Sequence, residues 1–345
     1  MAIYQIDPLI DPRWNALVSS HPRASVFHTV RWMRALHQSY GYTPVVFTTS
    51  PPGKPLANGL AFCDVQSWFT GRRLVSLPFS DHCEPLIGDC EEWRELMIGL
   101  RKKFDEGNWR YVEFRPLRGL PHNAGIFHES ESFCFHKLDL SPALDTLLHG
   151  LHKDCIRRKI HRAEREGLTI EQGRSDALLD KFCHLQLITR RRHQLPPQPR
   201  RWFKHLMHCL GKALEIRVAS KGERAVAALL TLRFRDTFVY KYGCSDENFH
   251  NLGAMQFLMW RSIEDAKKWG LRMFDFGRSD LADSGLITYK DRWGAQRSTL
   301  TYFRYPTVAH AHEDGWKLQM AKHIFERAPD SLLSIAGNLL YKHMG

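Results

Sequence analysis

Basic side chains are the most concentrated chemical groups in the sequence, and they gather in two segments. Lys153 to Arg165 holds six lysines and arginines against two acids, and Arg190 to Lys204 holds six with no acid. In a chain with a formal net charge of +12, such clusters raise the local concentration of phosphates, RNA or anionic lipid. An ordinary solvated helix face is the alternative interpretation of each cluster.

Histidines and cysteines form no metal-binding pattern. The tightest groupings, His149 with His152 and His205 with His208 and Cys209, lack a second half at the spacing of a zinc site. The eight cysteines are scattered and include no CxxC pair. We therefore expect no bound metal, and free thiols in a reducing compartment.

Length and composition indicate a globular protein with two domains of ordinary size. The chain has 345 residues, of which 43% are hydrophobic and 25% are charged. No apolar run is long enough to span a bilayer, and the first residues lack the basic-then-apolar order of a secretory signal. We expect a cytoplasmic location.

Two stretches of the sequence repeat one plan, which indicates a duplicated strand–helix–strand unit. Ser-Asp pairs occur at 80–81 and 245–246, each ahead of a helical pattern. Arg110 and Arg272 then each precede apolar residues, an acid and a phenylalanine. The sequence therefore predicts two similar domains.

Hydrophobic periodicity places further elements around these units. In the first half it predicts helices over 31–40 and 91–106 and strands over 44–49, 57–69, 73–77, 110–115 and 133–138. In the second half it predicts helices over 145–166, 177–193 and 253–269 and strands over 168–171, 214–219, 225–234, 237–242, 272–276 and 299–305. Each half should be a mixed α+β layer. A helical tail follows from about residue 312, docked on the protein or, as the minor alternative, touching a membrane surface.

Several motifs in the second half resemble the FemAB family. The resemblance begins in the basic helix from Leu151 to Gly167 and continues through Tyr240 to Ser245, Gly253-Ala254 and Phe274 to Gly277. It ends at Gly285 to Gly294, so that it covers most of residues 140–306. The first half is similar only through Ser25 to Trp32.

The resemblance implies an α+β fold with two tandem GNAT-like domains (the acyl-CoA N-acyltransferase fold), mixed sheets and a C-terminal helical tail. It implies a diverged N-terminal domain over residues 1–138, a catalytic domain over 139–310 and the tail over 311–345. The long coiled-coil arm that some family members insert in the second domain is absent, because only about 20 residues connect the helix at 177–193 with the strand at 214.

The family resemblance also implies an activity. Members join an acyl or aminoacyl group to an amine, so we expect an acyltransferase that modifies a cell-envelope precursor, either a peptidoglycan peptide or an amino sugar of an exopolysaccharide. No tightly bound cofactor is implied. The co-substrate would be acyl-CoA or aminoacyl-tRNA, both polyphosphate anions that suit the basic charge. The acceptor would be a nucleotide-sugar or a lipid-linked precursor, with peripheral contact at the inner face of the cytoplasmic membrane as an option and with no DNA.

The motif positions imply catalytic residues. Lys290 matches the lysine credited with stabilising the negative charge that builds on the carbonyl oxygen when the amine attacks. Tyr242 and Tyr289 could relay a proton, and Asp275 could receive the proton of the amine. The alternatives are an exposed loop lysine, half-buried strand aromatics and a structural ion pair of Asp275 with Arg272 or Arg278.

Donor and acceptor residues follow in the same way. The donor would contact the basic helix and the start of the helix at 253, through Arg157, Arg158, Arg162, His250, Gly253 and Ala254. In CoA-binding GNAT domains the loop before this helix begins with a glutamine or arginine and ends with a small residue. Here His250 and Met255 stand at these two positions, and this departure makes CoA a weaker candidate for the donor. The acceptor would contact Arg31, Trp32, Arg34 and Arg278. The competing hypothesis is a non-catalytic protein that binds RNA or an anionic surface on a decayed transferase fold.

Overall fold

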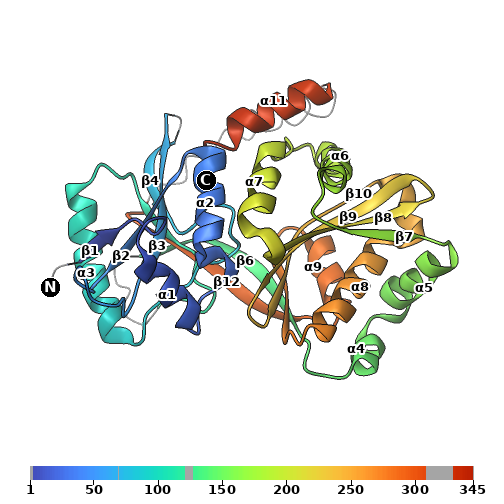
Figure 1. Ribbon diagram of the computed structural model, residues 1–345, viewed down its shortest axis with the longest axis horizontal. Helices are drawn as coiled ribbons and strands as arrows, with labels where there is room; N and C mark the ends of the chain where they lie inside the picture. The colour runs from blue at the N-terminus through green and yellow to red at the C-terminus, as the bar shows by residue number, and fades with distance from the viewer. Residues whose placement is uncertain (1–2, 69, 121–126, 308–328, 345) are drawn as a thin grey trace. The chain divides into compact units, whose positions relative to one another are not determined.

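The chain forms two compact units, each built from more than one segment of sequence. The structure is a computed structural model that describes residues 3–68, 70–120, 127–307 and 329–344 (Figure 1). Unit 1 contains residues 1–133, 299–311 and 339–345, and unit 2 contains residues 134–298 and 312–338. Each unit combines a mixed sheet with helices, which confirms the predicted α+β class.

Unit 1 has the strand order β1-β2-β3-β4-β5-β12. Its neighbours are antiparallel except for β4 and β5, which run parallel and are joined by helix α3. Helix α3 lays Trp93, Leu96 and Leu100 on the sheet, where they form the core with Phe62 and Phe114. The elements are β1 (Tyr4–Ile6), α1 (Pro12–Ser20), η1 (Val26–His28), α2 (Val30–Tyr40), β2 (Thr43–Thr48), β3 (Leu60–Ser67), β4 (Gly71–Val75), α3 (Cys90–Glu106), β5 (Val112–Phe114) and β12 (Gln296–Tyr305).

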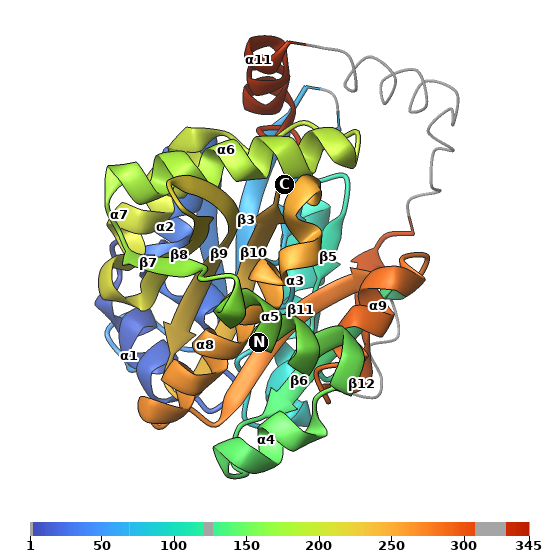
Figure 2. The ribbon, with the colours of Figure 1, turned by 90° about the vertical axis from the view of Figure 1, so that its right-hand side faces the viewer.

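Unit 2 has the strand order β6-β11-β10-β9-β8-β7, with β10 and β11 parallel and joined by helix α8. Figure 2 shows α5 and α8 beside each other, and both contribute to the apolar core of this unit. The elements are β6 (His128–Asp139), α4 (Leu144–Gly150), η2 (Lys153–Arg157), α5 (Arg158–Arg165), β7 (Thr169–Gly173), α6 (Asp176–Arg192), α7 (Arg200–Leu210), η3 (Gly211–Ala213), β8 (Leu214–Lys221), β9 (Arg224–Phe234), β10 (Thr237–Ser245), η4 (Glu247–Leu252), α8 (Ala254–Lys268), β11 (Met273–Asp280) and α9 (Ser284–Asp291). The helix α11 (Asp330–Leu340) follows near the C-terminus.

The last strand of each sequence half belongs mainly to the unit formed by the other half. Strand β12, which ends the second half, pairs antiparallel with β5 through Phe303↔Phe114 and so completes unit 1. Residues 134–139 of β6, which ends the first half, lie beside β11 and complete unit 2. The duplicated plan is therefore present, but the two copies exchange their final strands.

The predicted helix over 145–166 is wrong as one continuous helix. Leu151 and His152 adopt extended backbone conformations and separate α4 from a π-helical turn and α5. The His152 amide donates to the carbonyl of Arg292 at 2.9 Å, and its ring accepts from the amides of Asp154 and Cys155. These bonds replace the helical ones that the two residues give up.

Two helices near the site were not predicted. Helix α7 begins directly after the proline-rich loop at 195–199, and helix α9 occupies the motif that ends in Gly294. The predicted tail is represented by α11, while residues 308–328 lie outside the described residues. Within the described part of the chain, no helix combines the length and apolarity needed to cross a bilayer.

Candidate acyl-transfer site

The site of unit 2 begins where two parallel strands separate. Strands β10 and β11 are in register only from Thr237↔Met273 to Val239↔Asp275. Beyond that point β10 continues beside β9 to Ser245, with a bulge between Tyr240 and Tyr242. Because a bulge bends its strand, β10 leaves β11 and a gap opens between their carboxyl ends.

A cavity of about 720 Å³ is lined by residues around this gap. Its walls come from the start of β9, the second half of β10, the end of α6, the first turn of α8 and the start of α9. The lining residues are Thr189, Arg192, His193, Val226, Ala227, Tyr240, Gly243, Cys244, Ser245, Phe249, His250, Ala254, Met255, Gln256, Asp283, Gly285, Leu286 and Tyr289. The cavity thus combines an apolar body with a few polar groups, as small-molecule sites do.

Two tyrosines, Tyr240 and Tyr289, are among the residues that line this cavity. Gly243 makes room for one of them, because a Cβ atom at this position would stand 2.1 Å from the Tyr240 hydroxyl oxygen. Burial raises the pKa of Tyr240, and burial together with the nearby Tyr240 phenol raises the pKa of Tyr289. Both phenols therefore stay protonated at neutral pH and act as hydrogen-bond donors rather than bases.

A basic and polar corner lies around His250. Its Nε2 atom is 3.2 Å from Arg192 Nη1 and 2.9 Å from Ser245 Oγ. Burial, followed by the charge of Arg192, lowers the pKa of His250, so the ring is neutral at pH 7. Because a guanidinium can only donate, Nε2 accepts from Arg192 and the ring proton resides on Nδ1. Arg192 is left as the cation of this corner.

The start of α8 adds a partial positive charge. Gly253 is its N-cap, has a φ of +77° and offers no side-chain cap. A Cβ atom on Gly253 would stand 2.3 Å from the Lys159 carbonyl oxygen, so glycine here permits α5 to approach closely. Ala254, Met255 and Gln256 of the first turn line the cavity. Helix N-termini of this kind favour phosphate groups.

The predicted catalytic residues separate into one that lines the cavity and three that do not. Tyr289 is among the lining residues, whereas Lys290 is 2% exposed and its ammonium donates to the carbonyls of Gly277 and Arg278, both at 3.0 Å. The exposed-loop alternative for Lys290 is therefore wrong. Helix α9 explains the split, since neighbouring residues point about 100° apart around it.

Tyr242 and Asp275 have other partners in unit 2. The Tyr242 hydroxyl accepts from the indole nitrogen of Trp202 at 3.0 Å, on the side of the sheet that α7 covers. The buried Asp275 carboxylate accepts from the Gly277 amide at 2.7 Å, where the backbone of Gly277 is left-handed. The structure thus gives both residues local structural contacts, and their catalytic roles stay predictions.

The predicted donor residues are only partly brought together. His250 and Ala254 line the cavity, and Gly253 stands directly before Ala254. The basic helix turns its charges toward neighbouring acids instead: Arg158 is 2.9 Å from Asp154, and Arg162 is 3.9 Å from Glu166. Arg157 is half-buried. Two of the six basic side chains of this segment therefore have an acidic neighbour.

The predicted acceptor residues occupy different environments. Arg31 and Arg34 are exposed on α2, whereas Trp32 is fully buried in unit 1 and packs edge-to-face on Phe27 with ring centroids 5.0 Å apart. Arg278 is half-buried near the end of β11 in unit 2. Trp32 is positioned to hold α2 in the core, and its contact with an acceptor stays a prediction.

Sequence reasoning missed Tyr240, Gly243 and Arg192. The alternation Tyr240-Lys-Tyr242 was a signal, but the bulge between the two tyrosines decides which one faces the cavity, and a bulge has no clear sequence mark here. Arg192 was noticed only as part of a basic run. Among the described residues, no group of three histidine, cysteine or acidic side chains could hold a metal ion.

Comparisons with known proteins agree with this geometry. Residues 152–291 match the family model described as an acetyltransferase (GNAT) domain. The structure of FemX is similar with a TM-score of 0.70 and 13% identity, over 93% of this chain and 100% of that chain. No curated protein sequence matches the chain.

Two further structures share the fold. The C-terminal domain of a protein described as a lysylphosphatidylglycerol synthetase from Agrobacterium fabrum has a TM-score of 0.58 and 13% identity, over 92% of this chain and 96% of that chain. A tandem GNAT protein from the clavulanic acid biosynthesis pathway has a TM-score of 0.55 and 11% identity, over 89% of this chain and 99% of that chain. Residues 152–291 are therefore a GNAT acetyltransferase domain, the chain has the same fold as these tandem structures, and it is an acyltransferase.

Proposed function

We propose that the cavity of unit 2 binds an acyl-CoA thioester and that the chain transfers the acyl group to an amine of a cell-envelope precursor. The observation that carries this proposal is the cavity beside the end of β10 and the start of α8. It combines the uncapped start of α8, the cation of Arg192 and the two phenols in one place. A phosphate-bearing thioester needs this combination, since one end is anionic and the other must be activated.

The reaction requires a neutral amine to attack the thioester carbonyl. A C–N bond forms, negative charge builds on the carbonyl oxygen, and the C–S bond then breaks to release a thiolate. In the proposed mechanism the Tyr289 phenol, with Tyr240 beside it, donates a hydrogen bond to the developing anion or protonates the thiolate. The ammonium proton of the intermediate passes to Asp283 or to His193, whose pKa is lowered by burial and by Arg192.

Lys290 has a supporting place in this proposal. Its ammonium joins α9 to the end of β11 through the carbonyls of Gly277 and Arg278. Tyr289 is the next residue on the same helix, so this anchor fixes the direction of the phenol. Replacement of Lys290 by Ala is then expected to lower the transfer rate while thioester binding changes little, and an unchanged rate would remove Lys290 from the mechanism.

The acceptor class rests on the family resemblance and on the kinds of protein that share the fold. FemX and a lysylphosphatidylglycerol synthetase are both among the similar structures. We propose a primary amine on an envelope precursor, with Arg31, Arg34 and Arg278 as the candidate contacts for its phosphates. Guanidinium groups suit such phosphates because they can bind them through two parallel hydrogen bonds.

Aminoacyl-tRNA is the second candidate donor, and the net charge of +12 favours it. The local ion pairs of Arg158 and Arg162 favour it less, because these side chains already have carboxylate partners. A cavity of about 720 Å³ within a single unit also suits a compact carrier. The thioester is therefore the preferred donor.

Two binding measurements on the purified chain test this choice. Acetyl-CoA is expected to raise the midpoint of thermal unfolding, and Arg192→Ala should reduce that shift. Filter binding with charged tRNA, measured at two salt concentrations, tests the second donor. Stabilisation by tRNA alone would reject the thioester proposal, and stabilisation by neither would leave the cavity without a donor.

A further inference from the structure

Helix α9 depends on its neighbours for its direction. It has only eight residues, and it includes Gly285 and the β-branched Ile287 and Thr288, which favour a helix weakly. A helix this short is marginal on its own in water. Tyr289 and Lys290 stand in its last turn. The direction of the Tyr289 phenol is therefore set by the contacts that hold the end of α9.

The last residue of α9, Asp291, is held by a buried histidine. His136 is fully buried on strand β6, and its Nε2 atom is 3.1 Å from Asp291 Oδ1. Burial lowers the pKa of His136, so the ring is neutral at pH 7 and carries one proton. Hydrogen bonds from Arg297 lower the pKa of the Asp291 carboxyl, which is therefore ionised and can only accept. His136 thus donates from Nε2, while its Nδ1 lies 3.7 Å from Cys134 Sγ.

Asp291 has a second partner, but that partner lies at the surface. Arg297 donates to the Asp291 carboxylate with two nitrogens, from Nε at 2.5 Å and from Nη2. The Arg297 side chain is 56% exposed, whereas the His136 side chain is 0% exposed. An exposed ion pair contributes little, because solvent screens it and two mobile side chains must be ordered. The buried donor on a strand is therefore the contact that fixes the end of α9.

Two neighbouring strands hold the last turn of α9. Residues 134–139 of β6, where His136 lies, end the first half of the sequence and complete unit 2 beside β11. The end of β11 accepts the ammonium of Lys290 through two backbone carbonyls. Lys290 thus attaches α9 to β11, and Asp291 attaches it to β6. Because these two residues directly follow Tyr289, together they restrict rotation of the helix that would turn the phenol away from the cavity.

We propose that His136 is a positioning residue of the acyl-transfer reaction, which acts through Asp291 on the last turn of α9 and keeps Tyr289 directed at the cavity. The inference rests on the proposed function, because it concerns the step assigned to the Tyr289 phenol. His136 contacts no reacting atom in this proposal. A displacement of a reacting group by about 1 Å can lower a rate about 100-fold. Loss of His136 should therefore lower turnover and leave donor binding nearly unchanged.

Steady-state kinetics of the full chain with acetyl-CoA and a small amine test the proposal. His136→Leu removes the donor and should lower kcat about tenfold or more, with the KM for acetyl-CoA within a factor of about two. His136→Gln should restore most of kcat, because its amide nitrogen can donate from nearly the place of Nε2. Arg297→Ala should lower kcat less than about twofold. An unchanged kcat in His136→Leu would overturn the proposal, and so would a loss that His136→Gln shares in full.

A double variant separates this inference from the proposed function. In a chain that already carries Tyr289→Phe, His136→Leu should cause no further loss, because its effect passes through the phenol. If Tyr289→Phe alone keeps the full rate, the proposed proton donor is wrong and the inference falls with it. If Tyr289→Phe is slow while His136→Leu is not, or if the two losses multiply, only the inference is wrong.

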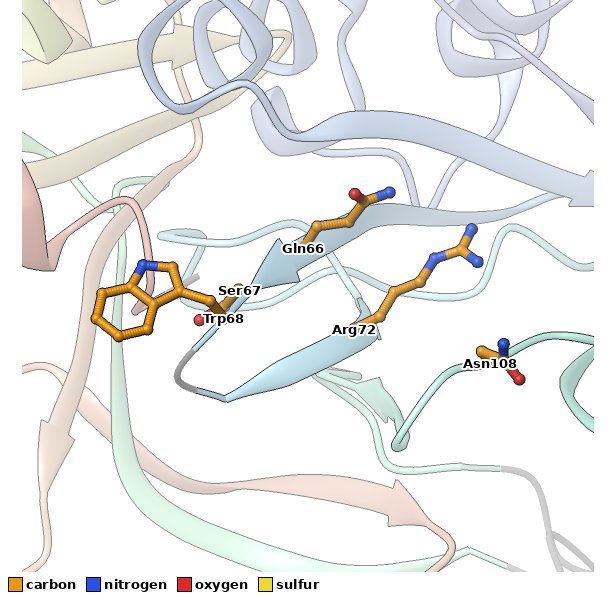
Figure 3. A pocket seen from close by; sticks show the side chains of 5 residues that line it. All are labelled: Gln66, Ser67, Trp68, Arg72 and Asn108. Atoms are coloured by element: carbon orange, nitrogen blue, oxygen red, sulfur yellow. The ribbon is translucent and has the colours of Figure 1, made fainter.

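An ion pair of unit 1 offers a matched control. Figure 3 shows Arg72 among the side chains that line a hollow of about 460 Å³. Its guanidinium donates to Asp64 from Nε at 3.0 Å and from Nη2 at 2.5 Å, so it resembles the pair at the end of α9. Asp64→Ala should leave kcat within a factor of about two. A loss as large as that of His136→Leu would show a general effect of removing polar contacts and would overturn the proposal.

Stability is kept apart from turnover by temperature. All rates are measured well below the midpoint of thermal unfolding of each variant, where a loss of stability alone leaves kcat unchanged. If His136→Leu does not fold, Asp291→Ala takes its place, since that side chain is 29% exposed. This variant should show the same loss of kcat with an unchanged KM for acetyl-CoA. A full kcat in Asp291→Ala would overturn the proposal.

Discussion

The two strand–helix–strand units of the chain share a plan and differ in what occupies the end of their parallel strands. In unit 2, the pairing of β10 and β11 ends at Val239↔Asp275, and a cavity lies beside the end of β10. In unit 1, β4 and β5 pair through Leu74↔Val112 and Val75↔Glu113, and the chain after β4 then folds back over the strand ends. At this point Cys83 and Arg115 form an isolated antiparallel β-bridge, in which the Cys83 amide donates to the Arg115 carbonyl at 2.7 Å.

Ion pairs further stabilise the packing at the strand ends of unit 1. Glu113, the counterpart of Asp275, accepts from Arg115 at 2.8 Å and from Arg304 at 2.7 Å. Burial opposes ionisation of Glu113, but the two guanidinium groups prevail and lower its pKa. In unit 1 these polar groups thus form internal pairs, whereas in unit 2 two tyrosines and the start of α8 line a cavity. The comparison supports the proposal that unit 2 performs the chemistry.

The largest effect should come from the phenols of the cavity. Tyr289→Phe removes a positioned proton donor and should lower the transfer rate about 100-fold or more, since general acid catalysis contributes about 10²–10⁴. Tyr242→Phe should change the rate far less, because its hydroxyl is held by Trp202. Steady-state kinetics with acetyl-CoA and an amine would measure both. A large loss in Tyr242→Phe with none in Tyr289→Phe would assign the proton donor to Tyr242 instead.

The core of unit 1 should give the chain acid sensitivity. Burial lowers the pKa of His28 from 6.5 to about 4, and its neutral ring accepts from the Ser25 amide and donates to the Glu84 carbonyl. Above pH 6.5 the folded and unfolded rings are both neutral. As the pH falls from 6.5 to 4, only the unfolded state gains a proton, so the free energy of unfolding should fall by about 3 kcal/mol.

Urea titrations of the original chain and of His28→Gln between these pH values would check this expectation. The variant should be less stable throughout, and its free energy of unfolding should vary less with pH. Identical pH slopes for the two proteins would show that another group is responsible.

A pair of glycine substitutions should separate close packing from backbone strain. Gly253→Ala places a Cβ atom 2.3 Å from the Lys159 carbonyl oxygen and should cost about 3 kcal/mol, as overpacking and strain add. Gly270 has a similar φ of +74° but open space around it, so Gly270→Ala should cost about 1 kcal/mol. Thermal unfolding would compare them. Equal losses would show that α5 does not press on the start of α8.

The smallest effect should concern donor affinity. Arg192→Ala should weaken acetyl-CoA binding about tenfold, the value of one charge-assisted hydrogen bond to phosphate. Arg158→Ala, on the basic helix, should leave affinity within a factor of about two, because exposed ion pairs contribute little. Isothermal titration would measure both constants. The reverse order would move the donor from the cavity to the basic helix.

The fold was predictable from the sequence to a large extent, and the site much less. The repeated Arg110 and Arg272 segments predicted two strand–helix–strand units, and in the structure the two strands of each unit pair in parallel across their helix. The direction of a side chain depends on finer features. A bulge decides between Tyr240 and Tyr242, and helix rotation decides between Tyr289 and Lys290. Neither feature leaves a pattern in composition or spacing.

The contacts of the basic helix were also not predictable from the sequence. Arg158 and Arg162 were assigned to donor binding, but the spacing of four residues places Arg158 beside Asp154 and Arg162 beside Glu166. Residue counts over a segment cannot distinguish such pairs from a binding surface. Arg192, which contacts His250, came from the other cluster.

The exchange of β6 and β12 limits how this protein can be divided. A fragment cut at the junction of the two repeats would keep its helices but lose β12 from one sheet and residues 134–139 from the other, leaving an unpaired backbone edge in each product. Each gene half therefore encodes a fragment that is incomplete by one strand.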